Sequence, residues 1–220
     1  MNNTIYFKNG NSITTIDNQN TIRSKQKGVG IISKLYFYHG TMNSGKSLDL
    51  VRSAYNYKER GMTPIIFKPS IATRNEDINK VKSRTGLEFP TITIEEDDSI
   101  YDILSLHSKP HVILIDEVQF LTVSQINELA RIVDTIHIPI LAYGLKTDFK
   151  SELFPASKRL LELADEIKEI KSICWCGKAA RLNARIVDGQ FQTEGDQILI
   201  GAEEKYITLC RKHYMEKKIQ

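Results

Sequence analysis

The octapeptide at residues 40–47, Gly-Thr-Met-Asn-Ser-Gly-Lys-Ser, has the composition and spacing of a phosphate-binding loop. It fits the pattern G-x-x-x-x-G-K-[ST] and follows the short apolar run Leu35–Tyr38, as a strand–loop–helix unit requires. Its glycines let consecutive backbone N–H groups point at one place, where the following helix N-terminus adds partial positive charge. Lys46 would reach the outer phosphates, and the Ser47 hydroxyl would hold Mg²⁺. The alternative is an ordinary glycine turn before a helix. We therefore expect a nucleoside triphosphate to bind at Gly40, Thr41, Met42, Asn43, Ser44, Gly45, Lys46 and Ser47.

Two acidic residues form the second candidate element of this site. Asp116 and Glu117 directly follow the continuous apolar run Val112–Ile115. In doubly wound sheets, ligands lie at the carboxyl ends of the strands, so both carboxylates should face the phosphate loop. Asp116 is placed to hold Mg²⁺, directly or through water, and Glu117 could accept a proton from an attacking hydroxyl or water. Acidic residues also follow strands as plain turn formers, but the pairing with the loop favours the functional interpretation.

The cysteines and one histidine form two short-spaced pairs with the arithmetic of a metal site. Cys174 and Cys176 precede residues 177–209, and Cys210 and His213 follow them. Two such pairs separated by a loop can present four ligands tetrahedrally to zinc, although the C-x-C spacing is tighter than the usual C-x₂-C. A closed four-ligand site is structural, and it would fix both ends of the intervening loop. The alternative is three inert cysteines and a surface histidine.

Bulk properties narrow the class of protein. The 220 residues suit one domain with a small appendage, and the net charge of +3 is too small to indicate nucleic acid or a membrane. No apolar run approaches the roughly 20 residues that cross a bilayer, and the start lacks a signal-peptide pattern. Three cysteines, an odd number, argue against a disulfide framework. We expect a cytoplasmic protein with no membrane or nucleic-acid partner.

Short apolar runs and helical patterns alternate from Leu35 onward, which predicts a parallel sheet with helices on both faces. The expected strands are Leu35–Tyr38, Pro64–Phe67, Val112–Ile115 and Ile138–Tyr143. The expected helices are Ser47–Arg60, Ser99–Leu106, Ser124–Thr135 and Ser157–Ala164. The fold class is thus α/β, a P-loop (RecA-like) parallel sheet, with a small C-terminal zinc-ribbon module.

The domain organisation follows from changes in composition along the chain. Residues 1–33 are rich in Asn, Ser and Thr and lack a sustained period, which favours a flexible leader, with a short edge strand at Thr4–Lys8 as the alternative. Residues 34–171 form the nucleotide-binding domain. After about Lys171 helical periodicity fades, so we expect the zinc-binding module at residues 172–216 and a tail at 217–220.

Four segments, together with the cysteine pairs, resemble the type II (cellular-type) thymidine kinases. They are Gly40–Ser47, Asp116–Phe120, Tyr143–Phe149 and the closing stretch from Gly201 through Tyr206 to Cys210–Tyr214. They occur in order over about residues 34–214, nearly everything but the leader. The conjunction is highly specific, although no one segment is decisive.

The resemblance implies transfer of the γ-phosphate of ATP to the 5′-hydroxyl of thymidine or deoxyuridine, with Mg²⁺, in nucleotide salvage for DNA synthesis. It makes Glu117 the catalytic base, assigns Ser47 and Asp116 to magnesium, and adds Gln119 to the phosphate-binding set. It implies that a loop at about residues 182–201, the "lasso", closes over the thymine. Arg185 matches a basic residue at the base of this loop. The substrate-binding residues that it implies are Met42, Phe120, Phe149, Leu199, Ile200, Gly201 and Tyr206. It also implies a homotetramer, with feedback inhibition by thymidine triphosphate.

The sequence departs from the family pattern at two positions of interest. Ala72 stands where the family usually has Asp, with Arg74 retained, which could weaken metal or phosphate organisation. Ala202 replaces the second glycine of a usual pair, which could stiffen or shift the lasso.

Two other classes of protein compete with a kinase. One is a DExx-box nucleic-acid-dependent ATPase with a zinc ribbon, because Asp116–Gln119 resembles that box; such motors need a second RecA-like domain, for which this chain has no room. The other is a non-enzymatic zinc-ribbon module fused to a degenerate nucleotide-binding domain. The intact Lys46, Ser47, Asp116 and Glu117 argue against it.

Overall fold

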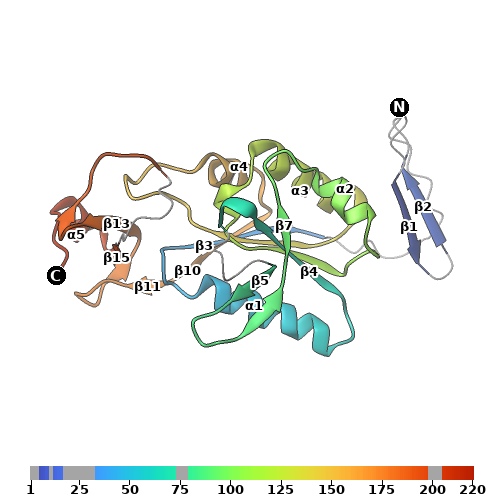
Figure 1. Ribbon diagram of the computed structural model, residues 1–220, viewed down its shortest axis with the longest axis horizontal. Coiled ribbons are helices and arrows are strands. Elements are labelled where there is room, and N and C mark those ends of the chain that lie inside the picture. Colours follow the sequence, from blue (N-terminus) through green and yellow to red (C-terminus); the bar gives the residue numbers. More distant parts are fainter. Residues whose placement is uncertain (1–4, 10–11, 17–32, 73–78, 198–204) are drawn as a thin grey trace.

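A six-stranded, all-parallel sheet organises the chain in the computed structural model, which describes residues 5–9, 12–16, 33–72, 79–197 and 205–220 (Figure 1). The strand order is β10-β3-β9-β8-β4-β7. The strands are β3 (Leu35–Gly40), β4 (Pro64–Pro69), β7 (Ile92–Ile94), β8 (Val112–Ile115), β9 (Ile140–Gly144) and β10 (Glu166–Ile170). Strand β9 lies between β3 and β8, so the loops after β3 and β8 open at the same edge of the sheet.

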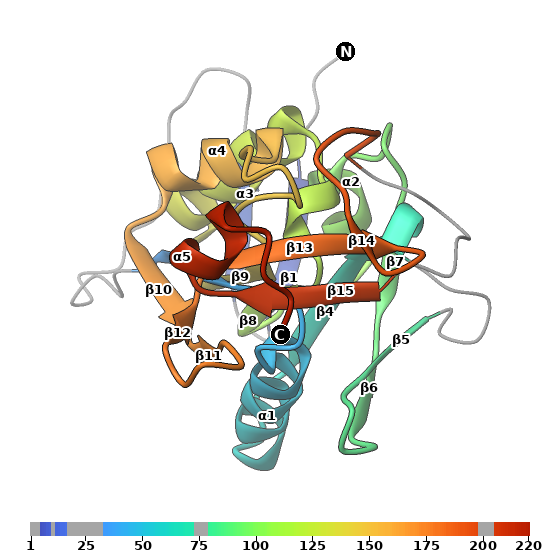
Figure 2. The ribbon, with the colours of Figure 1, turned by 90° about the vertical axis from the view of Figure 1, so that its left-hand side faces the viewer.

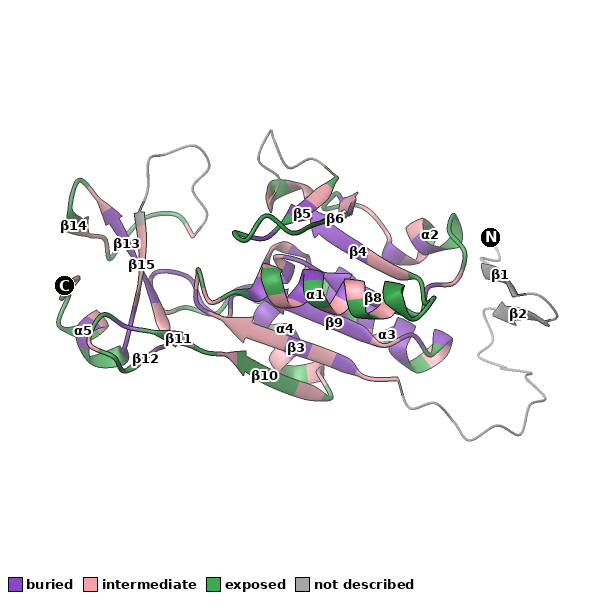
Figure 3. Ribbon diagram, turned by 90° about the horizontal axis from the view of Figure 1, so that it is seen from below, coloured by how far each residue is buried: buried purple, intermediate pink, exposed green. Residues whose placement is uncertain are grey.

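Helices cover both faces of this sheet (Figures 1 and 3). Helix α1 (Lys46–Glu59) lies on one face, and α2 (Ile100–Ser105), α3 (Val123–Ile136) and α4 (Pro155–Leu163) lie on the other. Strand β8 shows why: Ile113 and Ile115 join the core beneath α3, whereas Leu114 joins the core beneath α1. A strand that is buried on both faces is expected of a parallel α/β sheet.

Local sequence signals define where α2 and α3 begin. The Ser99 hydroxyl accepts the N–H of Asp102 at the start of α2. At α3, Thr122 and Gln125 form a capping box, in which each side chain accepts the other residue's backbone N–H. These caps satisfy N–H groups that would otherwise lack partners at a helix start.

The four predicted strands and four predicted helices are all present, but the sequence did not reveal the outer strands of the sheet. Strand β7 has only 3 residues, and β10 alternates Glu, Ile and Lys. Its edge position explains this composition, because charged side chains on an edge strand discourage pairing with other chains. A small hairpin of β5 (Lys80–Lys82) and β6 (Glu88–Pro90) was also not predicted.

The C-terminal residues form a separate group of short antiparallel strands, in front in Figure 2. The hairpin β11 (Ser172–Ile173) and β12 (Ala179–Ala180) leads into a sheet of order β14-β13-β15, followed by α5 (Arg211–Met215). The strands of that sheet are β13 (Leu182–Val187), β14 (Gln190–Phe191) and β15 (Lys205–Leu209). The small core of this module includes Cys174, Ala184 and Leu209. The prediction of a small C-terminal module is therefore confirmed at the level of the fold.

Within residues 1–33, β1 (Ile5–Asn9) pairs with β2 (Ser12–Ile16) as an antiparallel hairpin. Strand β1 overlaps the Thr4–Lys8 edge strand that the sequence offered as an alternative. In the sequence, the dipeptide between the two strands, Gly10-Asn11, is a hairpin signal that the polar composition of residues 1–33 obscured. No helix in the described residues is long and apolar enough to span a membrane.

Candidate active site

The phosphate loop connects the end of β3 to the start of α1 and depends on its two glycines. A Cβ at Gly40 would lie 2.7 Å from the backbone oxygen of Ile170 and would also collide with Ser44, so only glycine fits. Gly45 has a φ of 90°, in the left-handed region that glycine adopts without strain. These two positions hold the curled loop that the sequence pattern predicts.

Several polar groups in this loop remain available to an anion. Helix α1 has no side-chain cap, unlike α2 and α3, so its first N–H groups are open. Within the described residues, the buried hydroxyls of Thr41 and Ser44 have no hydrogen-bond partner. Orphaned buried donors beside a helix N-terminus fit the phosphates of a nucleotide.

Lys46 is buried at the centre of this loop, 7% exposed, and its Nζ donates a hydrogen bond to the Thr41 carbonyl at 2.8 Å. Burial lowers the pKa of Lys46, while the negative charges of Glu117 and Asp116 oppose that effect. The lysine therefore lies within electrostatic reach of both acidic residues.

Asp116 lies at the end of β8 and is almost fully buried, 4% exposed. Its backbone N–H bonds to the Phe67 carbonyl at 2.9 Å, which fixes it against the end of β4. Burial and the neighbouring Glu117 carboxylate raise the pKa of Asp116 to about 7, against the opposing charges of Lys68 and Lys46. A divalent cation would reverse this shift and favour the carboxylate, so the residue fits a magnesium ligand.

Glu117 is half-buried and has a φ of 50°, in the left-handed region that non-glycine residues rarely adopt. It caps the short 3₁₀ helix η2 (Val118–Phe120). Its Oε2 accepts a hydrogen bond from Gln119 Nε2 at 2.6 Å. Gln119, expected among the phosphate-binding residues, thus contacts the candidate base.

Two of the predicted pocket residues, Phe149 and Tyr206, both contact Arg185, the residue predicted at the base of the lasso. The Arg185 guanidinium lies 3.7 Å from the centroid of the Phe149 ring, and its Nε donates to the Tyr206 hydroxyl at 3.0 Å. Arg185 and Tyr206 are direct partners on the antiparallel strands β13 and β15. Phe120 instead packs edge-on against Phe154, with ring centroids 5.9 Å apart.

The C-terminal module forms hydrogen bonds with two parts of the site, the phosphate loop and the segment around Phe149. Asn183 on β13 accepts the backbone N–H of Met42 through Oδ1 at 2.8 Å, directly within the phosphate loop. Tyr214 on α5 donates its hydroxyl to the Phe149 carbonyl. Gln197 donates to the Asp148 carboxylate at 3.1 Å. Movement of the module would therefore disturb the phosphate loop and the segment around Phe149 together.

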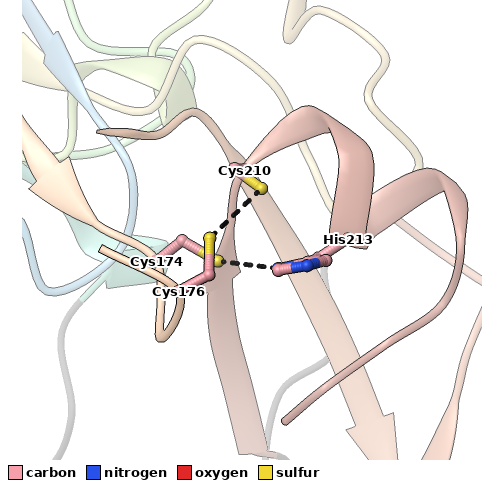
Figure 4. Close-up of side chains that lie close together, drawn as sticks. All are labelled: Cys174, Cys176, Cys210 and His213. Carbon is pink, nitrogen blue, oxygen red and sulfur yellow. Dashed lines mark hydrogen bonds between the residues drawn. The ribbon is translucent and has the colours of Figure 1, made fainter. Parts of the chain in front are cut away.

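The cysteine pairs and His213 converge at one point (Figure 4). Cys174 and Cys176 come from the turn between β11 and β12, whereas Cys210 and His213 come from the start of α5. All four ligand atoms lie within 4.8 Å of one another. The Sγ atoms of Cys176 and Cys210 are 3.9 Å apart, and Cys174 Sγ lies 3.4 Å from His213 Nδ1.

These distances fit a tetrahedral zinc site. With Zn–S bonds of about 2.3 Å and Zn–N bonds of about 2.0 Å, tetrahedral angles give S···S of about 3.8 Å and S···N of about 3.5 Å. Burial raises the pKa of the Cys174 thiol, but N–H hydrogen bonds from Cys176 and Cys210 outweigh it and lower the pKa to about 6. The thiolate form that metals require is therefore favoured.

Some of the residues named from the sequence lie outside the described residues: Leu199, Ile200, Gly201, Ala202 and Arg74. Ala72 ends the short 3₁₀ helix η1 (Ser70–Ala72) after β4. The sequence did not single out Asn183, which alternates with Arg185 as one of two polar residues among the apolar residues of β13. The sequence also gave no steric reason for Gly144, which packs closely against Val118 and Gln119.

We expect Asn183→Ala to weaken ATP binding by roughly 3–10-fold, because a net hydrogen bond is worth about 0.5–1.5 kcal/mol and the Met42 N–H would lose its partner. The measurement is calorimetric titration with a non-hydrolysable ATP analogue. Asn127→Ala is the control, since Asn127 accepts a similar bond from Arg159 on the exposed surface of α3. Equal affinities in both variants would contradict the expected coupling.

Comparison with known proteins matches this chain to a family. The family model described as "Thymidine kinase" matches residues 33–214. The thymidine kinase of Zymomonas mobilis subsp. mobilis is 47% identical over 190 residues, which cover 84% of this chain and 98% of the relative. That of Lactococcus lactis subsp. lactis is 45% identical over 190 residues, covering 86% and 100%. That of Legionella pneumophila (strain Lens) is 47% identical over 188 residues, covering 83% and 90%. The chain therefore belongs to the thymidine kinase family.

Proposed function

We propose that this chain transfers the γ-phosphate of ATP to the 5′-hydroxyl of thymidine or deoxyuridine. One observation carries the proposal: Lys46, Asp116 and Glu117 meet at one edge of the sheet, in a chain of the thymidine kinase family. A phosphate loop alone supports only triphosphate binding. The added carboxylates supply what a transfer site needs.

In the proposed reaction, the 5′-oxygen attacks the γ-phosphorus while its proton passes to the Glu117 carboxylate. The bond from the γ-phosphorus to the bridging oxygen breaks, and ADP leaves with the electron pair. Lys46 and the loop N–H groups hold the transferred phosphate and stabilise its developing charge. Mg²⁺ held by Ser47 and Asp116 would neutralise charge on the phosphates.

The acceptor nucleoside is proposed to lie between the phosphate loop and the C-terminal module. Met42, Phe120, Phe149 and Tyr206 are its proposed side-chain contacts, with Leu199, Ile200 and Gly201 supplying the lasso. The stacked Phe149 and Arg185 support this assignment, because an aromatic ring held rigidly from behind is a good platform for a pyrimidine.

We also propose that Cys174, Cys176, Cys210 and His213 hold a structural Zn²⁺. With four protein ligands it would have no open position for water and would brace the module. The homotetramer, the cytoplasmic location, the inhibition by thymidine triphosphate and the role in salvage for DNA synthesis remain proposals that rest on the family resemblance.

The test is phosphate transfer from ATP to a panel of nucleosides, with zinc quantified on the same sample. We expect thymidine and deoxyuridine to be phosphorylated at the 5′ position, purine deoxynucleosides not to be, and about one zinc per chain. A parallel assay adds single-stranded DNA without a nucleoside. ATP hydrolysis that DNA stimulates, with no thymidine monophosphate formed, would favour the DExx-box ATPase instead.

A further inference from the structure

The amide of Gln119 is used at both ends. Its Oε1 accepts the backbone N–H of Leu145 at 2.9 Å, and its Nε2 donates to Glu117 Oε2 at 2.6 Å. A backbone N–H can only donate, so the atom facing Leu145 must be the amide oxygen. The bond from Leu145 therefore fixes the direction of the amide and aims its donor at Glu117.

Gly144 is what allows Gln119 to reach this position. A Cβ at Gly144 would lie 2.8 Å from Val118 Cγ1 and 3.2 Å from the backbone nitrogen of Gln119, and closer still to Gln119 Oε1. Gly144 has no unusual φ, so close approach, not backbone conformation, explains the glycine. The last residue of β9 is thus shaped around Gln119, which is only 3% exposed.

Glu117 has little else to fix its side chain. Among the described residues, only the Gln119 side chain forms a hydrogen bond with the Glu117 carboxylate, and no lysine or arginine forms an ion pair with it. The bond occupies Oε2 and leaves Oε1 to accept a proton. The orientation of the carboxylate therefore depends on one neutral amide that is itself anchored to the main chain.

We propose that Gln119 is a positioning residue that aims the Glu117 carboxylate at the acceptor hydroxyl, and that Gly144 and the Leu145 N–H hold it in place. The inference rests on the proposed role of Glu117 as base. It assigns Gln119 to the acceptor side of the reaction and not to the phosphates of ATP. A general base acts only within hydrogen-bond reach of the proton that it accepts. If the Glu117 carboxylate is not held in place, kcat should fall while substrate affinity is unchanged.

The first test is Gln119→Met, which keeps length and volume but removes both polar ends. We expect kcat to fall roughly 10–100-fold, as misplacement of a catalytic group does, while the dissociation constants for thymidine and a non-hydrolysable ATP analogue change less than about threefold. Gln125→Met is the matched control, because Gln125 is equally buried but bonds to the α3 cap and to the carbonyls of residues 95, 96 and 98. It should lower Tm and leave kcat unchanged.

A double-mutant cycle separates positioning from general structural damage. If Gln119 acts through Glu117, adding Gln119→Met to Glu117→Gln should cause no further loss of kcat. The inference would be overturned if the kcat losses of the two substitutions multiplied in the double mutant, or if Gln119→Met alone had the kcat of the unmodified protein. If Glu117→Gln alone is fully active, the proposed base has failed, which is a distinct result. Gly144→Ala, which displaces the amide without removing it, replaces Gln119→Met if that variant does not fold.

Discussion

Replacement of Glu117 by glutamine is expected to lower kcat for thymidine phosphorylation by roughly 10²–10⁴-fold, the usual contribution of a general base. Glutamine has the same shape and can still accept the Gln119 hydrogen bond, but it cannot take the 5′-hydroxyl proton. ATP binding should be nearly intact, because the loop N–H groups and Lys46 are unchanged. Steady-state kinetics with both substrates, and titration with a non-hydrolysable ATP analogue, measure the two effects.

Glu128→Gln is the matched control for this experiment. The Glu128 carboxylate is structural, since its Oε2 accepts the backbone N–H of Ile100 at 2.8 Å at the start of α2. The control should lower Tm slightly and leave kcat unchanged. Near-normal turnover of Glu117→Gln would remove Glu117 as the base and leave Asp116, or water alone, to accept the proton.

The central strands and the helices of this fold could be predicted because their burial imposes a strong pattern. Val112–Ile115 is apolar throughout because both of its faces are covered. Helix α3 shows the three-and-four spacing of a helix that buries one side, and its start carries the Thr122 cap. In such segments, the pattern of apolar residues reveals which faces are buried.

Strand β10, at one edge of the sheet, could not be predicted for the opposite reason. Strand β10 has solvent along much of its length, and Figure 3 shows it largely exposed. Its Glu166 forms ion pairs with Lys34 and Lys168, so charged side chains interrupt any apolar pattern along this strand. The tertiary fold decides which strand pairs with such a segment, and hydrophobic periodicity in the sequence does not predict that pairing.

The candidate site divides in the same way. Lys46, Asp116 and the cluster of three cysteines with His213 could be singled out from the sequence because each lies in a recognisable local pattern. The Asn183–Met42 and Gln119–Leu145 hydrogen bonds could not, because their partners are 141 and 26 positions apart in the chain. Gly144 likewise gave no signal, since the steric reason for it lies in a different segment. Groups that orient other groups are therefore the part of a site that sequence patterns hide.

Replacement of Cys174 by serine is expected to reduce bound zinc toward zero and to loosen the C-terminal module. Structural zinc supplies roughly 10–16 kcal/mol of apparent binding energy in small zinc domains, and serine is a poor ligand for it. The module core is small, so the metal should dominate its stability. Zinc is measured by mass spectrometry after dialysis against a chelator, and module order by limited proteolysis.

The loss should reach both substrates, because the module is bonded to both halves of the site. Asn183 holds the Met42 N–H of the phosphate loop, and Tyr214 bonds to the carbonyl of Phe149. We expect thymidine affinity to fall by more than tenfold and ATP affinity by the smaller factor given for Asn183→Ala.

Ile173→Ser is the control, since Ile173 is adjacent to Cys174 and 73% exposed. This variant should keep its zinc and its affinities for both substrates. A zinc-free Cys174→Ser protein with unchanged thymidine affinity would show that the four ligands do not brace the site. Loss of thymidine affinity with ATP affinity intact would instead confine the coupling to Tyr214 and Phe149.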